Sequence, residues 1–267
     1  MEKSFETCIA NSINSSFLKR KVFVDFYLPR GKMDFNEIRL LLINDGQDLP
    51  AMDFNKIIQG LYEEDKILPL LCVGIHCGKD RKNEYGTAGI LNDKGEGAKA
   101  KLYTRFILEE LIPFISEQYG IASFKEKSFC GFSLGGLSAL DIIWNHANEF
   151  SKVGVFSGAL WWRTLSQNAP EFAEEKHRIM HNVIRNGSYH HGLKFFFEAG
   201  TQDETSDRNN NGIIDSIDDT LSLIDELVQK GYNRKTDIYY MEIMNGKHDT
   251  ATWSRAFPEF LKWGWGK

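Results

Sequence analysis

The stretch best suited to chemistry is Gly-Phe-Ser-Leu-Gly, which begins at Gly131 and places Ser133 between two glycines. Apolar residues precede it as in a strand and follow it at helical spacing, so we predict a strand, a tight turn and a helix. Glycines two positions before and two positions after the serine let the strand and the helix pack closely. The turn would carry the Ser133 hydroxyl to the edge of a sheet and aim the backbone N–H of Leu134 at a developing oxyanion. The pattern predicts a nucleophilic serine, although five residues can also match by chance.

A serine hydroxyl needs an imidazole as general base, and the imidazole needs a carboxylate that fixes its tautomer. His248 lies between the last predicted strand and the last predicted helix, and Asp203 follows the preceding strand. The chain order of Ser133, Asp203 and His248 is nucleophile, acid, base, which is the order in α/β-hydrolases. Glu204 and Asp207 are the alternatives for the acid, and a surface histidine at a helix start is the alternative for His248.

Two further features would surround a reacting ester. The backbone N–H of Gln47, just after a buried strand, is the best candidate for a second oxyanion donor beside that of Leu134. The alternative for Gln47 is a simple Asp-Gly turn. Trp161 and Trp162 follow another strand and could stack on an aromatic acyl group or a sugar ring, or could pack in the core or in a cap.

Strand patterns alternate with helix patterns along the chain, which predicts a mostly parallel sheet with helices on both faces. Polar loops after the carboxyl ends of such strands form the functional site. We expect one domain over residues 1–267, with a helical, irregular segment at 163–192 that could form a cap. The strands are expected at 21–28, 38–43, 67–75, 128–130, 152–156, 194–199 and 237–243, and the other helices at 54–63, 101–119, 217–230 and 250–263.

Composition narrows the class of protein. The chain has 267 residues, 42% of them hydrophobic and 26% charged, as in ordinary globular proteins. With a net charge of −5 and no long basic run, nucleic acid is not expected as a partner. No apolar run is long enough to span a bilayer, so no membrane partner is expected. Residues 1–20 contain no apolar signal-peptide core, which favours a cytoplasmic protein, unless a leader has been removed.

A second constellation predicts a calcium loop over residues 207–218. Oxygen-bearing side chains recur at positions one, three, five, nine and twelve of this loop, with glycine at position six, as in the calcium loop of EF-hands. The expected ligands are Asp207, Asn209, Asn211, the carbonyl of Ile213, Asp215 and Asp218.

The loop departs from the EF-hand pattern in having the shorter Asp218 instead of glutamate at position twelve and no helix before it. The alternative is an Asx-rich turn whose Asp218 or Asp219 caps the next helix. We expect a structural ion that stiffens the loop carrying Asp203, and no organic cofactor.

From residue 21 onward, the chain resembles the esterase family of α/β-hydrolases that includes feruloyl esterases, siderophore-ester hydrolases, S-formylglutathione hydrolase and the mycolyltransferases. Short motifs in a fixed order carry the resemblance: NDGQ at 44–47, DRKNEY at 80–85, FILEELIPFI at 106–115, GFSLGG at 131–136, SGALWW at 157–162, EAGTQDE at 198–204 and GKHD at 246–249. The resemblance implies an α/β-hydrolase fold. The nucleophile, acid, base and two oxyanion donors that it implies are Ser133, Asp203, His248, Gln47 and Leu134. Residues that it places at the border of the substrate are Arg81, Glu84 and Tyr85.

The expected reaction is hydrolysis of a small-molecule or carbohydrate-linked carboxylic ester through an acyl-enzyme intermediate. Two alternatives remain at this point. The same three residues could transfer the acyl group to a sugar or an alcohol, as in mycolyltransferases. The chain could also be a non-catalytic module that binds carbohydrate or another partner on a hydrolase scaffold.

Overall fold

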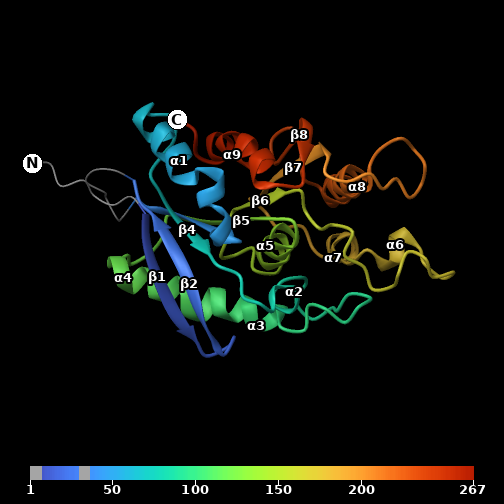
Figure 1. Ribbon diagram of the computed structural model, residues 1–267, viewed down its shortest axis with the longest axis horizontal. Helices are drawn as coiled ribbons and strands as arrows, with labels where there is room; N and C mark the ends of the chain where they lie inside the picture. The colour runs from blue at the N-terminus through green and yellow to red at the C-terminus, as the bar shows by residue number, and fades with distance from the viewer. Residues whose placement is uncertain (1–7, 30–36) are drawn as a thin grey trace, which may run out of the picture.

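The computed structural model describes residues 8–29 and 37–267, and within them eight strands form one sheet. The strand order across the sheet is β1-β2-β4-β3-β5-β6-β7-β8 (Figure 1). The strands are β1 (Cys8–Ser15), β2 (Arg20–Tyr27), β3 (Arg39–Asn44), β4 (Leu70–Ile75), β5 (Glu126–Phe132), β6 (Lys152–Phe156), β7 (Lys194–Gln202) and β8 (Ile238–Lys247).

The sheet is parallel from β4 through β8, and β1 and β2 join it antiparallel at one edge. Every residue of β4 is buried, as is nearly all of β3, because helices cover both faces there. The predicted parallel sheet with helices on both faces is therefore confirmed. Strand β1 was not predicted, because its CIANSINS sequence is largely polar and lies half-exposed at the edge of the sheet.

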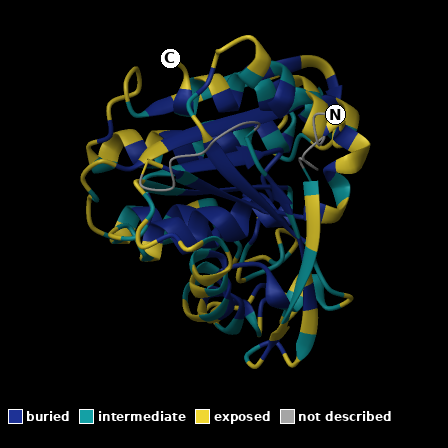
Figure 2. Ribbon diagram, turned by 90° about the vertical axis from the view of Figure 1, so that its left-hand side faces the viewer, coloured by how far each residue is buried: buried dark blue, intermediate teal, exposed yellow. Residues whose placement is uncertain are grey.

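Alternate side chains of β3 enter two separate cores. Leu40 and Leu42 pack with the helices of one face, whereas Leu41 and Ile43 pack with those of the other. Figure 2 shows the buried strands between two layers of helices whose outer sides are exposed. The helices of the first face are α3 (Ala100–Arg105), α4 (Ile112–Tyr119), α5 (Leu134–Asn145), α7 (Ile179–Asn186) and α8 (Asp215–Lys230). The helices of the second face are α1 (Phe54–Glu63) and α9 (Thr250–Trp265).

Short helices complete the described part of the chain. They are η1 (Gly46–Asp48), η2 (Pro50–Met52), α2 (Arg81–Glu84), the π-helical η3 (Phe106–Leu111) and α6 (Glu174–His177). The helix predicted over 101–119 runs through α3, η3 and α4. Its π-helical turn directly precedes Pro113, which has no N–H to donate to the preceding turn.

The segment 163–192 contains α6 and α7 joined by turns, and α7 packs beside α8. The Arg178 guanidinium at the start of α7 pairs with Asp219 of α8 at 2.9 Å. Within residues 8–29 and 37–267, no helix combines the length and apolar character that crossing a membrane requires. Residues 1–7 of the segment assessed for a leader peptide lie outside the described residues.

Candidate active site

Ser133 lies on a sharp turn between β5 and α5. Its backbone has φ 54° and ψ −123°, a conformation that costs free energy for a residue with a Cβ. Neighbouring backbone holds it there: the Ser133 N–H donates to the carbonyl of Phe156 at 2.8 Å, and its carbonyl accepts from the N–H of Ala159 at 3.1 Å. The strained serine is thus fixed to β6 and to the loop that follows it.

The two glycines of the pattern are required by close contacts. A Cβ at Gly131 would lie 2.5 Å from the carbonyl of Gly135, and a Cβ at Gly135 would lie 2.5 Å from Oδ2 of Asp45. Both distances are far below ordinary van der Waals contact. Both contacts therefore favour glycine, as the sequence predicts, at Gly131 because of the neighbouring backbone and at Gly135 because of the Asp45 carboxylate.

A pocket of about 250 Å³ opens beside the Ser133 turn. It brings Ser133, Asp203 and His248 together from the loops after β5, β7 and β8. The other lining residues are Ser157, Gly158, Trp161, Glu204 and Ser216. Three side chains that are far apart in sequence thus share one small cavity at the carboxyl edge of the sheet.

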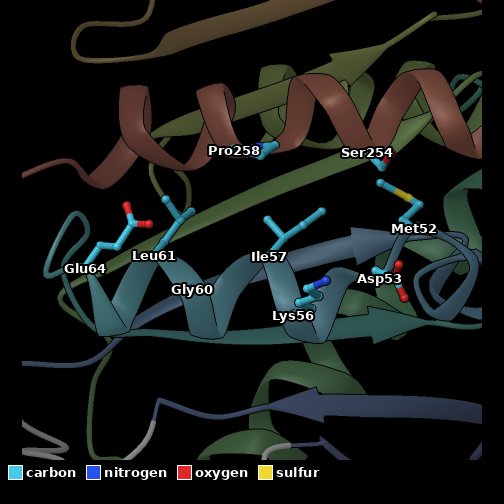
Figure 3. A pocket seen from close by; sticks show the side chains of 9 residues that line it. All are labelled: Met52, Asp53, Lys56, Ile57, Gly60, Leu61, Glu64, Ser254 and Pro258. Carbon is cyan, nitrogen blue, oxygen red and sulfur yellow. The ribbon is translucent and has the colours of Figure 1, made fainter.

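A second pocket, of about 440 Å³, lies between α1 and α9. Figure 3 shows Ile57 and Leu61 projecting from α1 toward α9, where Pro258 faces them. Its polar lining side chains, Asp53, Lys56, Glu64 and Ser254, include no histidine that could activate the serine. We therefore place the candidate chemistry in the pocket at Ser133.

His248 lies at the end of β8, just before α9. The carboxylate of Asp249 caps α9 by accepting the N–H of Thr252 at 2.8 Å, which fixes the helix start next to the imidazole. The His248 ring packs edge-on against Trp253, with the ring centroids 5.4 Å apart. Partial burial lowers the pKa of His248, and the negative charge of Asp203 opposes that shift. The imidazole is therefore neutral, as a general base must be, at and somewhat below neutral pH.

Asp203 is held by the turn that follows β7. Its Oδ2 accepts the N–H of Gly200 at 3.1 Å, whereas its Oδ1 is buried and has no hydrogen-bond partner. Burial raises the pKa of Asp203, and the positive potential of His248 is among the influences that lower it. Among the hydrogen bonds of the described residues, none links Ser133 to His248 or His248 to Asp203. Such bonds are often long before substrate binds.

The structure distinguishes among the three carboxylates considered for the acid. Glu204 lines the same pocket, but the charges that shift the pKa of His248 are those of Asp203, Arg81 and Asp249. Asp207 lies in the next loop, where it accepts the backbone N–H groups of Asn211 and Gly212. Asp203 is therefore the best-placed of the three.

The two predicted oxyanion donors lie at the starts of helices that follow two adjacent strands, β3 and β5. Leu134 is the first residue of α5 and Gln47 is the second residue of η1, and N–H groups in a first helical turn have no acceptor within the helix. The side chain of Gln47 is anchored, since its Oε1 accepts the N–H of Cys77 at 3.0 Å. Asp45, in the left-handed conformation with φ 59°, turns the chain between β3 and η1.

The residues expected at the substrate border lie at different depths. Arg81 forms two hydrogen bonds to Asp45, 2.8 and 2.6 Å long, and its side chain is 30% exposed. Glu84 is 1% exposed and pairs with Arg20 at 2.6 Å, and Tyr85 is fully buried. The hydroxyl of Tyr85 accepts the N–H of Asp45 at 3.2 Å. In this structure Tyr85 therefore supports the loop that carries Gln47, Glu84 pairs with β2, and neither residue lines the pocket at Ser133.

The two adjacent tryptophans also lie in different environments. Trp161 is 36% exposed and lines the pocket, whereas Trp162 is 2% exposed and belongs to the core. Of the two alternatives in the sequence, substrate stacking is open to Trp161, and core packing describes Trp162.

Side chains of the predicted calcium loop form hydrogen bonds within the loop itself. Asp207, Asn209 and Asn211 accept backbone N–H groups within the loop, and both asparagine amides donate to Asp218. Asp215 instead accepts the N–H of Arg208 at 2.9 Å. Within the described residues, no group of three or more His, Cys, Asp and Glu side chains is arranged to hold a metal ion.

Two residues next to the candidate acid were not predicted from the sequence. Ser157 lines the pocket, and Glu198 is a buried carboxyl on β7. The available signal for Glu198 was an acidic residue directly after the apolar run Phe195–Phe197, where a buried strand would place it in the interior.

Comparisons with known proteins agree with the fold. The sequence profile of a family described as "Putative esterase" matches residues 15–263. A Bacillus subtilis protein, YjcH, described as uncharacterized, is 22% identical over 252 residues, which cover 93% of each chain. These matches extend over almost the whole chain.

Solved structures show the same fold. Enterochelin esterase from Shigella flexneri superposes with a TM-score of 0.73 at 19% identity, covering 97% of this chain and 58% of that one. The present chain therefore spans little more than half the length of that enzyme. The siderophore hydrolase EstB from Aspergillus nidulans superposes with a TM-score of 0.68 at 16% identity, covering 97% of this chain and 95% of that one. Since a single family profile covers nearly all of the sequence, the chain belongs to the esterase family and adopts the α/β-hydrolase fold.

Proposed function

We propose that the protein is a carboxylic ester hydrolase that acts through Ser133, His248 and Asp203 and an acyl-enzyme intermediate. The observation that carries this proposal is the pocket of about 250 Å³ that all three side chains line, with Ser133 on its strained turn. Membership of the esterase family supports ester hydrolysis as the reaction.

In the proposed reaction, Oγ of Ser133 attacks the ester carbonyl while the His248 imidazole takes the hydroxyl proton. The oxyanion that forms accepts hydrogen bonds from the backbone N–H groups of Leu134 and Gln47. His248 then gives its proton to the leaving alcohol, and water, activated by the same imidazole, releases the acid and restores Ser133. The carboxylate of Asp203 stabilises the imidazolium during both steps.

The substrate we propose is a small ester with an aromatic or otherwise ring-shaped acyl group. Trp161 supports this choice, because its exposed indole lies in the pocket beside Ser133. The similar solved structures include a ferulic acid esterase and an enterobactin esterase, the latter also determined in the presence of enterobactin. A panel of feruloyl, acetyl and siderophore esters tests the choice, and Trp161→Ala is expected to raise KM for aromatic esters more than for acetyl esters.

The central test is Ser133→Ala. The variant is expected to lose hydrolysis of p-nitrophenyl acetate and labelling by a fluorophosphonate probe while keeping the circular-dichroism spectrum of the wild type. Turnover that survives in the variant would reject Ser133 as the nucleophile. Absence of labelling in the wild type would favour a binding module, and ester products with added acceptor alcohols would favour acyl transfer.

Calcium binding by residues 207–218 is a separate proposal. The spacing of Asp207, Asn209, Asn211 and Asp218 supports it, because these oxygen-bearing side chains lie around one short loop, in which both asparagines hydrogen-bond to Asp218. Arg208 already pairs with Asp215 at 3.1 Å, on the side of the loop next to α8. An ion at this loop would hold the chain that leads from Asp203 into α8.

A further inference from the structure

A second carboxyl lies buried near the candidate acid. Glu198 is on β7, five residues before Asp203, and is 1% exposed. Strand alternation with Phe196 directs it to the face covered by α9. Both of its side-chain oxygens are buried without a hydrogen-bond partner, as is Oδ1 of Asp203. Burying carboxylate oxygens without hydrogen-bond donors costs free energy. A proton held by the Glu198 or the Asp203 carboxyl would provide one of the missing donors.

The charges around Glu198 favour its protonated form. The charged groups that act on it are Asp203, from the loop after its own strand, and Arg255 from α9. Burial first, and then the negative charge of Asp203, raise the pKa of Glu198 to about 8. Two neighbouring carboxyls do not both ionise easily. Asp203 is the better site for the negative charge, because it has the Gly200 N–H as a donor and His248 beside it, whereas the Glu198 carboxyl has no donor.

Ser157 is associated with both carboxyls. Its backbone is in the left-handed region, with φ 43°, and its N–H donates to the Glu198 carbonyl at 2.8 Å. Its hydroxyl oxygen accepts the indole N–H of Trp253 at 2.9 Å. With one lone pair occupied, the hydroxyl proton is free to turn to a carboxyl, and a hydrogen bond donated in this way would lower the pKa of the carboxyl that receives it.

Trp253 connects this group to the other two members of the site. The same indole packs edge-on against His248 and stacks on Phe132, next to Ser133, with ring centroids 4.9 Å apart. It is 7% exposed. One rigid ring in α9 therefore contacts residues at the nucleophile turn, at the base and beside the acid.

We propose that Glu198, Ser157 and Trp253 are positioning residues for the candidate catalytic acid. Glu198 holds a proton, which confines a single negative charge to Asp203, and the Ser157 hydroxyl, oriented by Trp253, donates to the Asp203 carboxylate. When Glu198 ionises, it competes for the Ser157 hydroxyl and repels Asp203. The inference rests on the proposed ester hydrolysis, and it predicts that Glu198 sets an upper pH limit for activity.

The test is the pH profile of kcat/KM on p-nitrophenyl acetate between pH 5 and 10. The wild type is expected to lose activity as pH rises through about 8. Glu198→Gln, whose amide is a permanent donor, is expected to lack this fall. Glu198→Leu is expected to lower kcat at every pH, roughly tenfold to a hundredfold, because leucine has no polar group that could position Asp203. Glu242→Gln, the same change at an exposed position of β8, is expected to retain the fall.

Two further variants test Ser157 and Trp253. Ser157→Ala removes the hydroxyl with little change in shape, whereas Trp253→Phe removes the indole N–H together with part of the ring. Both variants are expected to lower kcat more than they change KM. Circular dichroism and melting temperature show whether each variant folds. A fall in the kcat of Ser157→Ala at an unchanged melting temperature supports the hydrogen bond, and an unchanged kcat contradicts it.

The outcomes separate the two proposals. An active wild type whose pH profile coincides with that of Glu198→Gln overturns the positioning inference and leaves the esterase proposal intact. A wild type that neither hydrolyses esters nor reacts with a fluorophosphonate overturns the proposed function, and the inference with it.

Discussion

Arg81 and Asp45 form a two-pronged ion pair beside the candidate nucleophile, with N–O distances of 2.8 and 2.6 Å. The Asp45 carboxylate is 2% exposed and lies against the Gly135 backbone, which belongs to the helix that follows Ser133. The pair thus joins three segments: the loop carrying Gln47, the short helix α2 and the start of α5. In this arrangement Arg81 holds Asp45, at the start of the loop that carries Gln47.

Arg81→Ala should leave the buried Asp45 carboxylate without its main partner. We expect a loss of roughly 3 kcal/mol in the free energy of unfolding, because removing one member of a buried pair exposes the desolvation cost of the other. The kcat on a simple ester should also fall, since Gln47 would move. Urea unfolding and steady-state kinetics measure the two effects. Lys262→Ala, which breaks a surface pair with Glu259, is the control, and equal behaviour of the two variants would contradict the role of Arg81.

Gly135→Ala should destabilise the protein because the new Cβ would lie 2.5 Å from the Asp45 carboxylate. Accommodating extra atoms in a well-packed site typically lowers the free energy of unfolding by roughly 1–3 kcal/mol. Gly60→Ala, in α1, is the matched control, because its Cβ would meet nothing within 4 Å. For Gly60→Ala we expect the free energy of unfolding to rise by about 0.5–1 kcal/mol, because alanine has the higher helix propensity. Thermal melts of the two variants should shift in opposite directions, and shifts of the same sign would count against this account of the turn.

The pH dependence of activity should show a low acid limit. Partial burial, the largest influence, lowers the pKa of His248 below its ordinary value of 6.5. Only the neutral imidazole can act as a base, so kcat/KM should stay high below pH 6.5 and fall as pH decreases through the lowered pKa. Asp203→Asn removes the charge that raises this pKa, so its acid limit should move to still lower pH while kcat drops. An acid limit above 6.5 in the wild type would be inconsistent with the environment of His248.

Calcium should raise the melting temperature if residues 207–218 bind it. We expect a higher value with calcium than after EGTA treatment, because a ligand that binds only the folded state stabilises that state. Asp207→Ala and Asp218→Ala should abolish the difference. Identical melting curves with and without the ion, together with no calcium in the mass spectrum of the native protein, would refute the proposal.

The sequence determined the framework of this protein. The apolar run 38–43 is typical of a strand buried on both faces, and the alternation of strand and helix patterns predicts a parallel sheet. Because parallel strands end at the same edge, the polar residues after them had to gather there, which is why Ser133, Asp203 and His248 could be selected before any coordinates. The glycines flanking Ser133 carried equally local information, since close backbone approach leaves no alternative to glycine.

Only the tertiary structure decided which side chains face the pocket and which are buried beneath it. Trp161 and Trp162 are adjacent in sequence, yet one lines the pocket and the other lies in the core. The buried carboxyl of Glu198 and its neighbour Ser157 came together through strand pairing between β6 and β7, which is a long-range contact. The apolar run before Glu198 indicates a buried strand, but the partners of each side chain depend on how distant segments pack.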